Sequence, residues 1–219
     1  MLVVVPDLIN ADELREMRRI GAAGGFGSGK ATAGANVRAV KDNLELQGEA
    51  ATARLRAMIQ QAFARSTLVS DAVLPRMMTA PLMSLYRAGM AYGTHLDLAM
   101  AERNRLRSDL SMTLFLSDPD AYAGGELVIE SDYGVQQVRL PAGHAVFYPT
   151  LFPHRVAKVE RGERLACVLW IQSLVREPDR RRILFDLAQT GGCLERPRQD
   201  EAYAMLMRCH QNLLRMWSS

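Results

Sequence analysis

The middle of the chain carries three side chains that can bind a metal ion together. His95 and Asp97 are separated by one residue, and His154 follows in a later segment. Two imidazoles and one carboxylate are the protein ligands that leave three adjacent positions open on non-haem Fe(II). An H-x-D pair alone occurs by chance in many proteins, and a histidine after Pro153 could simply close a turn. The prediction of an iron site therefore depends on the residues that accompany these three.

Arg164 and Tyr86 indicate an organic anion beside that metal. Arg164 begins the apolar segment RLACVLWI, and burying its charge without a partner would cost several kcal/mol. A guanidinium is planar and pairs with a carboxylate through parallel hydrogen bonds. A dicarboxylate whose other end chelates the metal explains this position, and Tyr86 is placed to add its hydroxyl to the same carboxylate. The alternatives are a surface charge for Arg164 and an aromatic that fills the core for Tyr86.

The elements that position these residues are predicted to be short strands. About eight β-type segments lie within 75–173, separated by predicted turns such as Arg161-Gly162-Glu163, and no helical pattern interrupts them. This pattern favours a sandwich or jelly roll, whose open mouth can hold a metal and a small ligand. Alternation along YGTHLDLA would direct His95 and Asp97 to one face of a strand, with Leu96 in apolar packing on the other. His154 must then come from another strand of the same barrel.

The segment before these strands is predicted to contain a short strand and helices. Met1 to Val5 is β-branched and predicts a strand, and Asn10 with Glu13 forms a capping-box pair at the start of a helix. The glycine cluster at 21–29 lacks the spacing of a phosphate-binding loop and favours a flexible loop, with no role indicated for 24–29. Apolar residues within 49–68 recur with a helical period.

The segment after the strands is also predicted to be helical. Pro178 can begin a helix that ends at Gly191-Gly192, and an amphipathic helix follows over roughly 200–217. The helices are expected to brace the barrel rather than to form a second domain. We therefore expect one structural unit in three parts, namely an N-terminal strand and helices over 1–74, a jelly-roll core over 75–175 and C-terminal helices over 176–219.

The composition is that of a soluble globular protein. The 219 residues are 48% hydrophobic and 23% charged, and the net charge of +3 is too small to indicate nucleic acid. No segment approaches the roughly 18 apolar residues of a membrane span, and the N-terminus lacks the features of a signal peptide. The three cysteines show no C-x-x-C spacing, which suits a reducing compartment. We expect a cytoplasmic protein, with a C-terminal apolar helix that could serve a homodimer.

Longer motifs make the chain resemble a known family. The string Tyr86-x-x-Gly89-x-x-Tyr92-x-x-His95-x-Asp97 and the ending His154…Arg164…Trp170 resemble the prolyl 4-hydroxylase-like branch of the Fe(II)/2-oxoglutarate-dependent dioxygenases. The segments LPAGHAVFYPTLFPHRV and RGERLACVLWIQSLVR are similar, more specifically, to the bacterial PKHD-type hydroxylases. The similarity covers nearly the whole chain, although the glycine-rich segment near 24–29 departs from it.

The resemblance implies a fold, a ligand set and a reaction. It implies a mainly β protein with flanking α-helices around a double-stranded β-helix, the cupin-like jelly roll. Iron ligands are implied at His95, Asp97 and His154, and 2-oxoglutarate pairing at Arg164. The implied reaction consumes O2 and 2-oxoglutarate, hydroxylates an unactivated C–H bond and releases succinate and CO2. The resemblance also admits stimulation by L-ascorbate (vitamin C), and leaves open whether the substrate is peptidyl or a small molecule.

Two other functions remain compatible with the same residues. A non-catalytic jelly-roll metal protein that senses 2-oxoglutarate, iron or O2 would keep the same ligands but would form no succinate. A cupin-type enzyme with another divalent metal and no co-substrate would retain activity after Arg164→Ala. For the other polar residues we expect mostly structural positions: a solvated edge for Arg87, Arg107 and Asp109, a turn for His144, and a core or interface position for His210.

Overall fold

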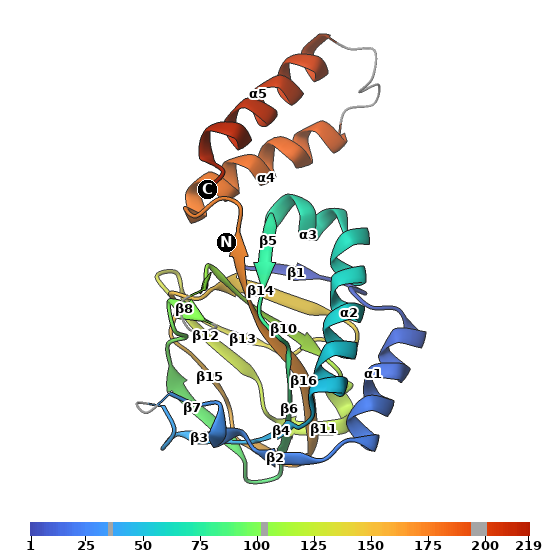
Figure 1. Cartoon of the computed structure of the whole chain (residues 1–219). Helices are drawn as coiled ribbons and strands as arrows, with labels where there is room; N and C mark the ends of the chain where they lie inside the picture. The colour runs from blue at the N-terminus through green and yellow to red at the C-terminus, as the bar shows by residue number, and fades with distance from the viewer. Residues whose placement is uncertain (35–36, 102–104, 194–200) are drawn as a thin grey trace.

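Two antiparallel sheets form the body of the molecule in a computed structural model that describes residues 1–34, 37–101, 105–193 and 201–219 (Figure 1). The larger sheet has nine strands, and the smaller sheet has five. The larger sheet runs in the order β1 (Val3–Val5), β14 (Ala145–Pro149), β10 (Leu110–Phe115), β16 (Val159–Ser173), β6 (Leu82–Arg87), β4 (Leu44–Leu46) and β2 (Phe26–Ser28), while β5 (Pro75–Met78) and β11 (Tyr122–Gly124) also pair with β16. The smaller sheet runs β13 (Gly134–Val138), β12 (Leu127–Ser131), β15 (His154–Val156), β7 (Ala91–His95) and β3 (Lys41–Asp42). A separate pair consists of β8 (Met100–Ala101) and β9 (Leu106–Arg107).

The larger sheet has an apolar outer face that packs against helices. On β10 the alternate residues Leu110 and Leu114 are buried in one cluster with Cys167 and Ile171 of β16. The helices α1 (Ala11–Ala23), α2 (Glu49–Arg65) and α3 (Thr67–Ala72) supply the other half of this cluster, through residues such as Met17, Leu55, Ile59 and Val69. Figure 1 shows α1 and α2 side by side along this sheet. Burial of alternate residues explains why the sheet holds its register, because a shift of one residue would reverse the two faces.

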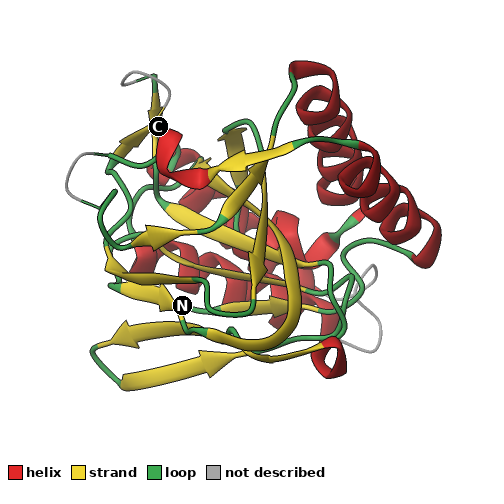
Figure 2. Cartoon of the chain, turned by 90° about the horizontal axis from the view of Figure 1, so that it is seen from below, coloured by secondary structure: helices red, strands yellow, loops and turns green. Residues whose placement is uncertain are grey.

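The inner face of the same sheet is directed toward a cavity and carries polar residues. Ser111 and Thr113 alternate with the apolar residues of β10, and Arg164 alternates with those of β16. Arg164 lies directly opposite Tyr86 of β6, so both side chains project to the same face. The cavity is also lined by residues of the smaller sheet, including His154 of β15. Its mixed lining shows that the two sheets enclose one space, as expected for a jelly roll. Figure 2 shows the strands gathered in the body of the molecule, with helices along one side.

The capping box predicted at the first helix is confirmed. The Asn10 side chain accepts from the backbone N–H of Glu13 at 2.9 Å, and the Glu13 carboxylate accepts from the Asn10 N–H at 2.8 Å. The helix predicted within 49–68 is α2. Residues 1–74 also supply β1 to β4, so this segment contributes strands to both sheets as well as helices.

The prediction of a flexible loop at the glycine cluster was wrong. Gly21 belongs to α1, while Phe26–Ser28 forms β2 and Gly29–Ala31 a short 3-10 helix. Strand β2 pairs with β4, which brings Gly24 so close to Leu46 that a Cβ at Gly24 would collide with the leucine side chain. These glycines therefore permit close packing, which a pattern of turn residues does not reveal.

Two predicted breaks in secondary structure are absent from the observed elements. Arg161-Gly162-Glu163 was expected to be a turn, but it lies within the single strand β16, because Gly162 pairs with Tyr122 of β11. The helix α4 (Pro178–Cys193) continues through Gly191 instead of ending there. Gly191 is buried against Tyr203 and Leu206 of the last helix, so its lack of a side chain serves helix packing.

The C-terminal helices form a hairpin at one end of the molecule. Figure 1 shows α4 and α5 (Glu201–Trp217) extending away from the sheets. The hairpin is attached through an apolar cluster that joins Val175 and Leu184 to Leu214 and Trp217. None of the residues of α5 is fully buried. In the described parts of the chain, no helix combines the length and the apolar character needed to cross a membrane.

Candidate metal centre

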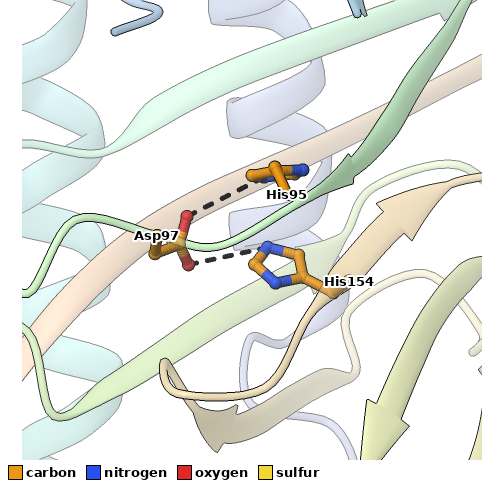
Figure 3. A group of neighbouring side chains, drawn as sticks. All are labelled: His95, Asp97 and His154. Atoms are coloured by element: carbon orange, nitrogen blue, oxygen red, sulfur yellow. Dashed lines mark ion pairs between the residues drawn. The ribbon is translucent and has the colours of Figure 1, made fainter. Parts of the chain in front are cut away.

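His95, Asp97 and His154 converge at the inner side of the smaller sheet. One ligand atom from each side chain can be chosen such that all lie within 4.8 Å of one another. The two Asp97 oxygens face the imidazoles, with His95 Nε2 at 3.9 Å and His154 Nε2 at 3.5 Å (Figure 3). Strands β7 and β15 pair directly, with His95 opposite His154. The prediction that His154 arrives from another strand of the barrel is therefore confirmed.

The expected strand geometry of the H-x-D pair was wrong. Strand β7 ends at His95, so Asp97 lies in the irregular segment that follows. Leu96 is 55% exposed instead of being packed in the core. Because Asp97 has left the strand, its direction is set by local contacts rather than by alternation. Ser111 of β10 supplies such a contact, since its hydroxyl donates to Asp97 Oδ2 at 2.6 Å.

The backbone fixes the orientation of both histidine rings. His95 Nδ1 lies 2.9 Å from the Gly93 carbonyl oxygen, and His154 Nδ1 lies 3.1 Å from the Phe152 carbonyl oxygen. A carbonyl can only accept, so each Nδ1 carries the proton and each Nε2 presents its lone pair to the space beside Asp97. Burial, assisted by the charge of His154, lowers the pKa of His95 to about 4. The neutral ring that a metal requires is thus favoured near pH 7.

Tyr92 supports His95 from the side. The two rings are stacked with centroids 3.7 Å apart and an angle of 14°. Simple alternation would place residues three apart on opposite faces, but the β7–β15 register shifts between the His95↔His154 and Tyr92↔Val156 pairs. This irregularity lets Tyr92 and His95 share the inner face. Neither Tyr92 nor Ser111 was assigned a role from the sequence, although the polar alternation of Ser111 and Thr113 in an apolar strand was a usable signal.

Arg164 is buried on the inner face without an acidic partner. Its side chain is 1% exposed, and its guanidinium lies 5.3 Å from the Tyr86 ring centre and 5.4 Å from that of Phe115. Nε has no hydrogen-bond partner, and no ion pair involves Arg164 within the described residues. An unpaired buried cation is costly, so the chemistry of this position calls for an anionic ligand. The residues present therefore fit a bound carboxylate.

Tyr86 lies beside this arginine in a buried, polar environment. Burial raises the pKa of the Tyr86 phenol to about 12; the charge of Arg164 opposes this increase, and that of Glu45 adds to it. The hydroxyl therefore stays protonated and can donate a hydrogen bond to an anion. Its position opposite Arg164 on neighbouring strands brings the two polar groups to one end of the cavity.

One cavity of about 270 Å³ joins the two groups of residues. Its lining includes His95, Asp97 and His154, from the smaller sheet and the segment after β7, and Tyr86 and Arg164, from the larger sheet. A small dicarboxylate can therefore lie in a single space with one end toward the converging ligand atoms and the other toward the guanidinium. The side chains of His95 and Asp97 are 6% and 7% exposed, and His154, Tyr86 and Arg164 are buried. Such low exposure is typical of a ligand-binding pocket.

The other polar residues considered from the sequence lie in structural contacts. Arg87 forms an exposed pair with Glu163, as expected for a solvated edge. Asp109 is buried and paired with Arg107, which corrects the expectation of a solvated edge for these two. Their pair holds β16 in place, because Arg107 donates to the Ser173 carbonyl at 3.2 Å and Asp109 accepts from the Ser173 N–H at 2.9 Å.

The two remaining histidines lie outside the central cavity. His144 Nδ1 accepts from the Asp7 backbone N–H at 3.3 Å, which ties a turn to the segment after β1. His210 lies on α5, half-buried, and its charge acts on Asp71 at the end of α3. Both positions agree with structural rather than ligand roles.

Comparison with known proteins gives the family. The model of the 2OG-Fe(II) oxygenase superfamily matches residues 81–172, which include all five cavity residues described above. A PKHD-type hydroxylase of Xanthomonas euvesicatoria is 42% identical over 229 aligned positions, which cover 100% of this chain and 99% of the relative. A PKHD-type hydroxylase of Thermosynechococcus vestitus is 40% identical, with the same coverage. The chain belongs to the PKHD-type hydroxylases.

Solved structures show the same fold as this hydroxylase. A Pseudomonas putida prolyl-4-hydroxylase has a TM-score of 0.53 at 23% identity, covering 78% of this chain and 92% of that one. A Trichoplax adhaerens prolyl hydroxylase has a TM-score of 0.56 at 14% identity, covering 84% and 86%. The mainly β fold with flanking helices and a jelly-roll core is confirmed. As a member of the 2OG-Fe(II) oxygenases, the hydroxylase uses Fe(II), 2-oxoglutarate and O2. The family therefore favours the dioxygenase over a non-catalytic sensor and over a cupin-type enzyme without a co-substrate.

Proposed function

We propose that the hydroxylase binds Fe(II) through His95, Asp97 and His154, and binds the distal carboxylate of 2-oxoglutarate through Arg164 and Tyr86. The observation that carries this assignment is a buried arginine without an acidic partner, in the same cavity as three converging ligand atoms. Two imidazoles and a carboxylate suit Fe(II) and leave positions for the co-substrate and O2. Bound Fe(II) with 2-oxoglutarate and O2 supplies the oxidant for hydroxylation of a C–H bond, with succinate and CO2 as co-products.

The protein residues hold the ligands and exclude water. The Gly93 and Phe152 carbonyls accept from Nδ1 of the two histidines and so keep each Nε2 directed inward. The Ser111 hydroxyl restrains the Asp97 carboxylate, and the Tyr92 ring limits rotation of His95. Such supporting contacts determine ligand geometry as much as the ligands themselves. The Arg164 guanidinium and the Tyr86 hydroxyl orient the co-substrate, so that its keto acid end meets the metal ligands.

The substrate is proposed to enter past an apolar rim. Leu96 and Leu98 line the cavity and are 55% and 70% exposed, so an apolar contact surface lies next to Asp97. The Trichoplax structure is a prolyl hydroxylase in complex with a peptide fragment, which supports a peptidyl substrate. The cavity lining selects neither a particular peptide sequence nor a particular small molecule. The proposed substrate is therefore a peptidyl group or a small molecule that carries an apolar group beside the reacting C–H bond.

Further properties belong to the same proposal. A cytoplasmic setting is supported by three cysteines that form no disulfide, and the lack of a nucleic-acid partner by the small net charge. A homodimer through α5 is supported by the exposed side chains of Met205 and Met216. Stimulation by L-ascorbate follows from the family resemblance and would appear as a faster release of succinate. The division into 1–74, 75–175 and 176–219 is retained as a description of one structural unit.

The proposal is tested by measuring succinate released from 2-oxoglutarate by the purified Fe(II)-loaded protein. We expect release that depends on Fe(II) and O2, and a loss of at least about 10³-fold in Asp97→Ala, because the remaining histidines cannot hold the metal in place. Asp118→Ala changes an exposed aspartate on the outside of the molecule and serves as the matched control. Asp97→Ala with the same succinate release as the control would rule out the assigned metal ligands.

A further inference from the structure

Buried polar atoms without hydrogen-bond partners are concentrated around the cavity. Seven such side-chain atoms occur in the described residues, and four of them belong to cavity-lining residues, namely Asn43 (Nδ2 and Oδ1), Ser108 (Oγ) and Arg164 (Nε). An unsatisfied buried polar group costs free energy, so such a group is retained where a ligand can satisfy it. Asn43 is 3% exposed and has no role in the site assigned above.

Asn43 is held rigidly where the chain crosses from the smaller sheet to the larger one. It lies between β3, which pairs with β7, and β4, which pairs with β6. Its backbone carbonyl accepts from the Gly29 N–H at 2.9 Å, and its side chain packs on the bare Cα of Gly29, where a Cβ would collide with Oδ1. The last glycine of the glycine-rich segment thus makes room for this amide.

The neighbouring charges are satisfied among themselves. Lys41 Nζ donates to Glu45 Oε1 at 2.6 Å and to the Thr32 hydroxyl at 2.9 Å, and that hydroxyl donates to Glu45 Oε2 at 2.7 Å. This closed network fixes the segment on both sides of Asn43. It leaves the Asn43 amide as the group of this segment that is free to meet a ligand.

The Asn43 amide is close to the polar end of the cavity. It lies beside the Tyr86 hydroxyl, because a hydrogen-bond interaction with the Asn43 side chain lowers the pKa of the phenol against the larger effect of burial. This contact lacks the geometry of a full hydrogen bond, so both amide atoms keep the capacity to bind a ligand. The Tyr86 ring is in turn 5.3 Å from the Arg164 guanidinium. An amide, a phenol and a guanidinium therefore surround one end of the cavity, and all three can donate to an anion.

We propose that the Asn43 amide is a further hydrogen-bond donor to the distal carboxylate of 2-oxoglutarate, and so a determinant of co-substrate affinity. A carboxylate can accept about four hydrogen bonds, and Arg164 with Tyr86 leaves capacity for another donor. The inference rests on the proposed function, because it assigns the carboxylate that Arg164 binds. It also gives the glycine-rich segment a purpose, since Gly29 sets the position of the amide.

Calorimetric titration of the Mn(II)-loaded protein, which cannot turn over, measures this contact. Asn43→Leu keeps the size of the side chain and removes the donor, and we expect the Kd for 2-oxoglutarate to rise about tenfold or more, as for a lost hydrogen bond to a charged group. The Kd for 2-oxovalerate, which lacks the distal carboxylate, should not change. Asn212→Leu, the same substitution on α5, is the control and should change neither value.

The alternatives give different results. Equal Kd values for 2-oxoglutarate in Asn43→Leu and in the control would overturn the inference while leaving the proposed function intact. An equal loss for both keto acids would also overturn it, because Asn43 would then act on the metal end. If Asn43→Leu fails to fold, Gly29→Ala displaces the amide instead and should weaken 2-oxoglutarate selectively. Absence of 2-oxoglutarate binding by the unaltered Mn(II) protein would contradict the proposed function itself.

Discussion

The two faces of the larger sheet are built from the same strands but meet opposite requirements. On β10 and β16 the outer residues Leu114 and Cys167 are buried in a hydrophobic cluster with residues of the helices. On the opposite face of the same two strands, Thr113 and Arg164 are directed to the cavity, and Arg164 carries a buried charge that no described residue pairs. The outer face stabilises the fold, and the inner face keeps groups unsatisfied for a ligand.

This difference means that stability and activity should respond separately to changes on the two faces. Burial of alternate residues fixes the register of the strands, so the helices on one side determine where the polar groups on the other side are placed. The apolar packing on the outer face offsets the free energy that burial of the unpaired Arg164 cation costs. Binding sites commonly break local rules of stability in this way.

The largest expected effect concerns Arg164→Met. The substitution should raise the KM for 2-oxoglutarate at least about 10²-fold, because a bidentate charged partner is lost. The Tm of the protein without ligands should stay the same or rise, since a buried unpaired charge is replaced by an apolar side chain of similar length. Succinate release at varied 2-oxoglutarate and a thermal melt measure the two quantities. A lower Tm with an unchanged KM would reverse the assignment of the faces.

Leu114→Ala should have the opposite outcome. Leu114 is completely buried on the outer face, and its truncation should lower the free energy of unfolding by about 2–5 kcal/mol through lost contacts and a residual cavity. The KM for 2-oxoglutarate should change less than about twofold at a temperature where the variant is folded. The folded molecules keep the same cavity, and a lower free energy of unfolding affects binding only when unfolded protein is present. Urea unfolding with kinetics at low temperature tests this. A rise in KM as large as that of Arg164→Met would show that the faces are not separable.

Ser111→Ala should produce a smaller, local effect on the metal. The hydroxyl donates to Asp97 at 2.6 Å, and loss of such a contact to a ligand typically weakens metal affinity about 10-fold to 100-fold. Titration with Fe(II) under anaerobic conditions should show this loss. The preference for 2-oxoglutarate over a keto acid without a distal carboxylate, which depends on Arg164, should not change. Thr113→Ala, on the same face of β10, is a suitable comparison. Unchanged Fe(II) affinity in Ser111→Ala would show that Asp97 is held by other contacts.

The smallest effect is the pH dependence of the metal-free protein. Burial lowers the pKa of His95 to about 4 from an ordinary value of 6.5, so the unfolded chain binds more protons than the folded one between these values. The free energy of unfolding should therefore fall, by on the order of 1 kcal/mol, as the pH is lowered from 6.5 toward 4. His95→Gln should reduce this slope in urea unfolding at several pH values. An unchanged slope would show that His95 is not the group responsible.

The sequence allowed the fold class and the five cavity residues to be predicted because each has a local signal. Helical and strand periods, the capping pair of Asn10 and Glu13, and the position of Arg164 at the start of an apolar strand can all be recognised without coordinates. Long motifs around His95 and His154 strengthened these predictions. The roles of the five residues in binding metal and co-substrate stay predictions until variants are measured.

Other features could not be predicted because they depend on contacts between distant segments. The irregularity in β7 places Tyr92 on the same face as His95 only through pairing with β15. The position of Asn43 depends on its contact with Gly29 and on the crossing of the chain from β3 in the smaller sheet to β4 in the larger one. The continuity of β16 through Gly162 depends on pairing with β11. Alternation within one segment misplaced Leu96 for the same reason, since the strand ends at His95.

The central claim is that one cavity holds both Fe(II) and a dicarboxylate, with Arg164 as the anchor of the second. Anaerobic titration with Fe(II) and 2-oxoglutarate, followed through the visible absorption of the iron–keto acid chelate, tests it most directly. We predict a band that requires both ligands, persists in folded Leu114→Ala and is lost in Arg164→Met at the same 2-oxoglutarate concentration. A band of equal intensity and equal 2-oxoglutarate dependence in Arg164→Met, or no band in the unaltered protein with iron bound, would contradict the account.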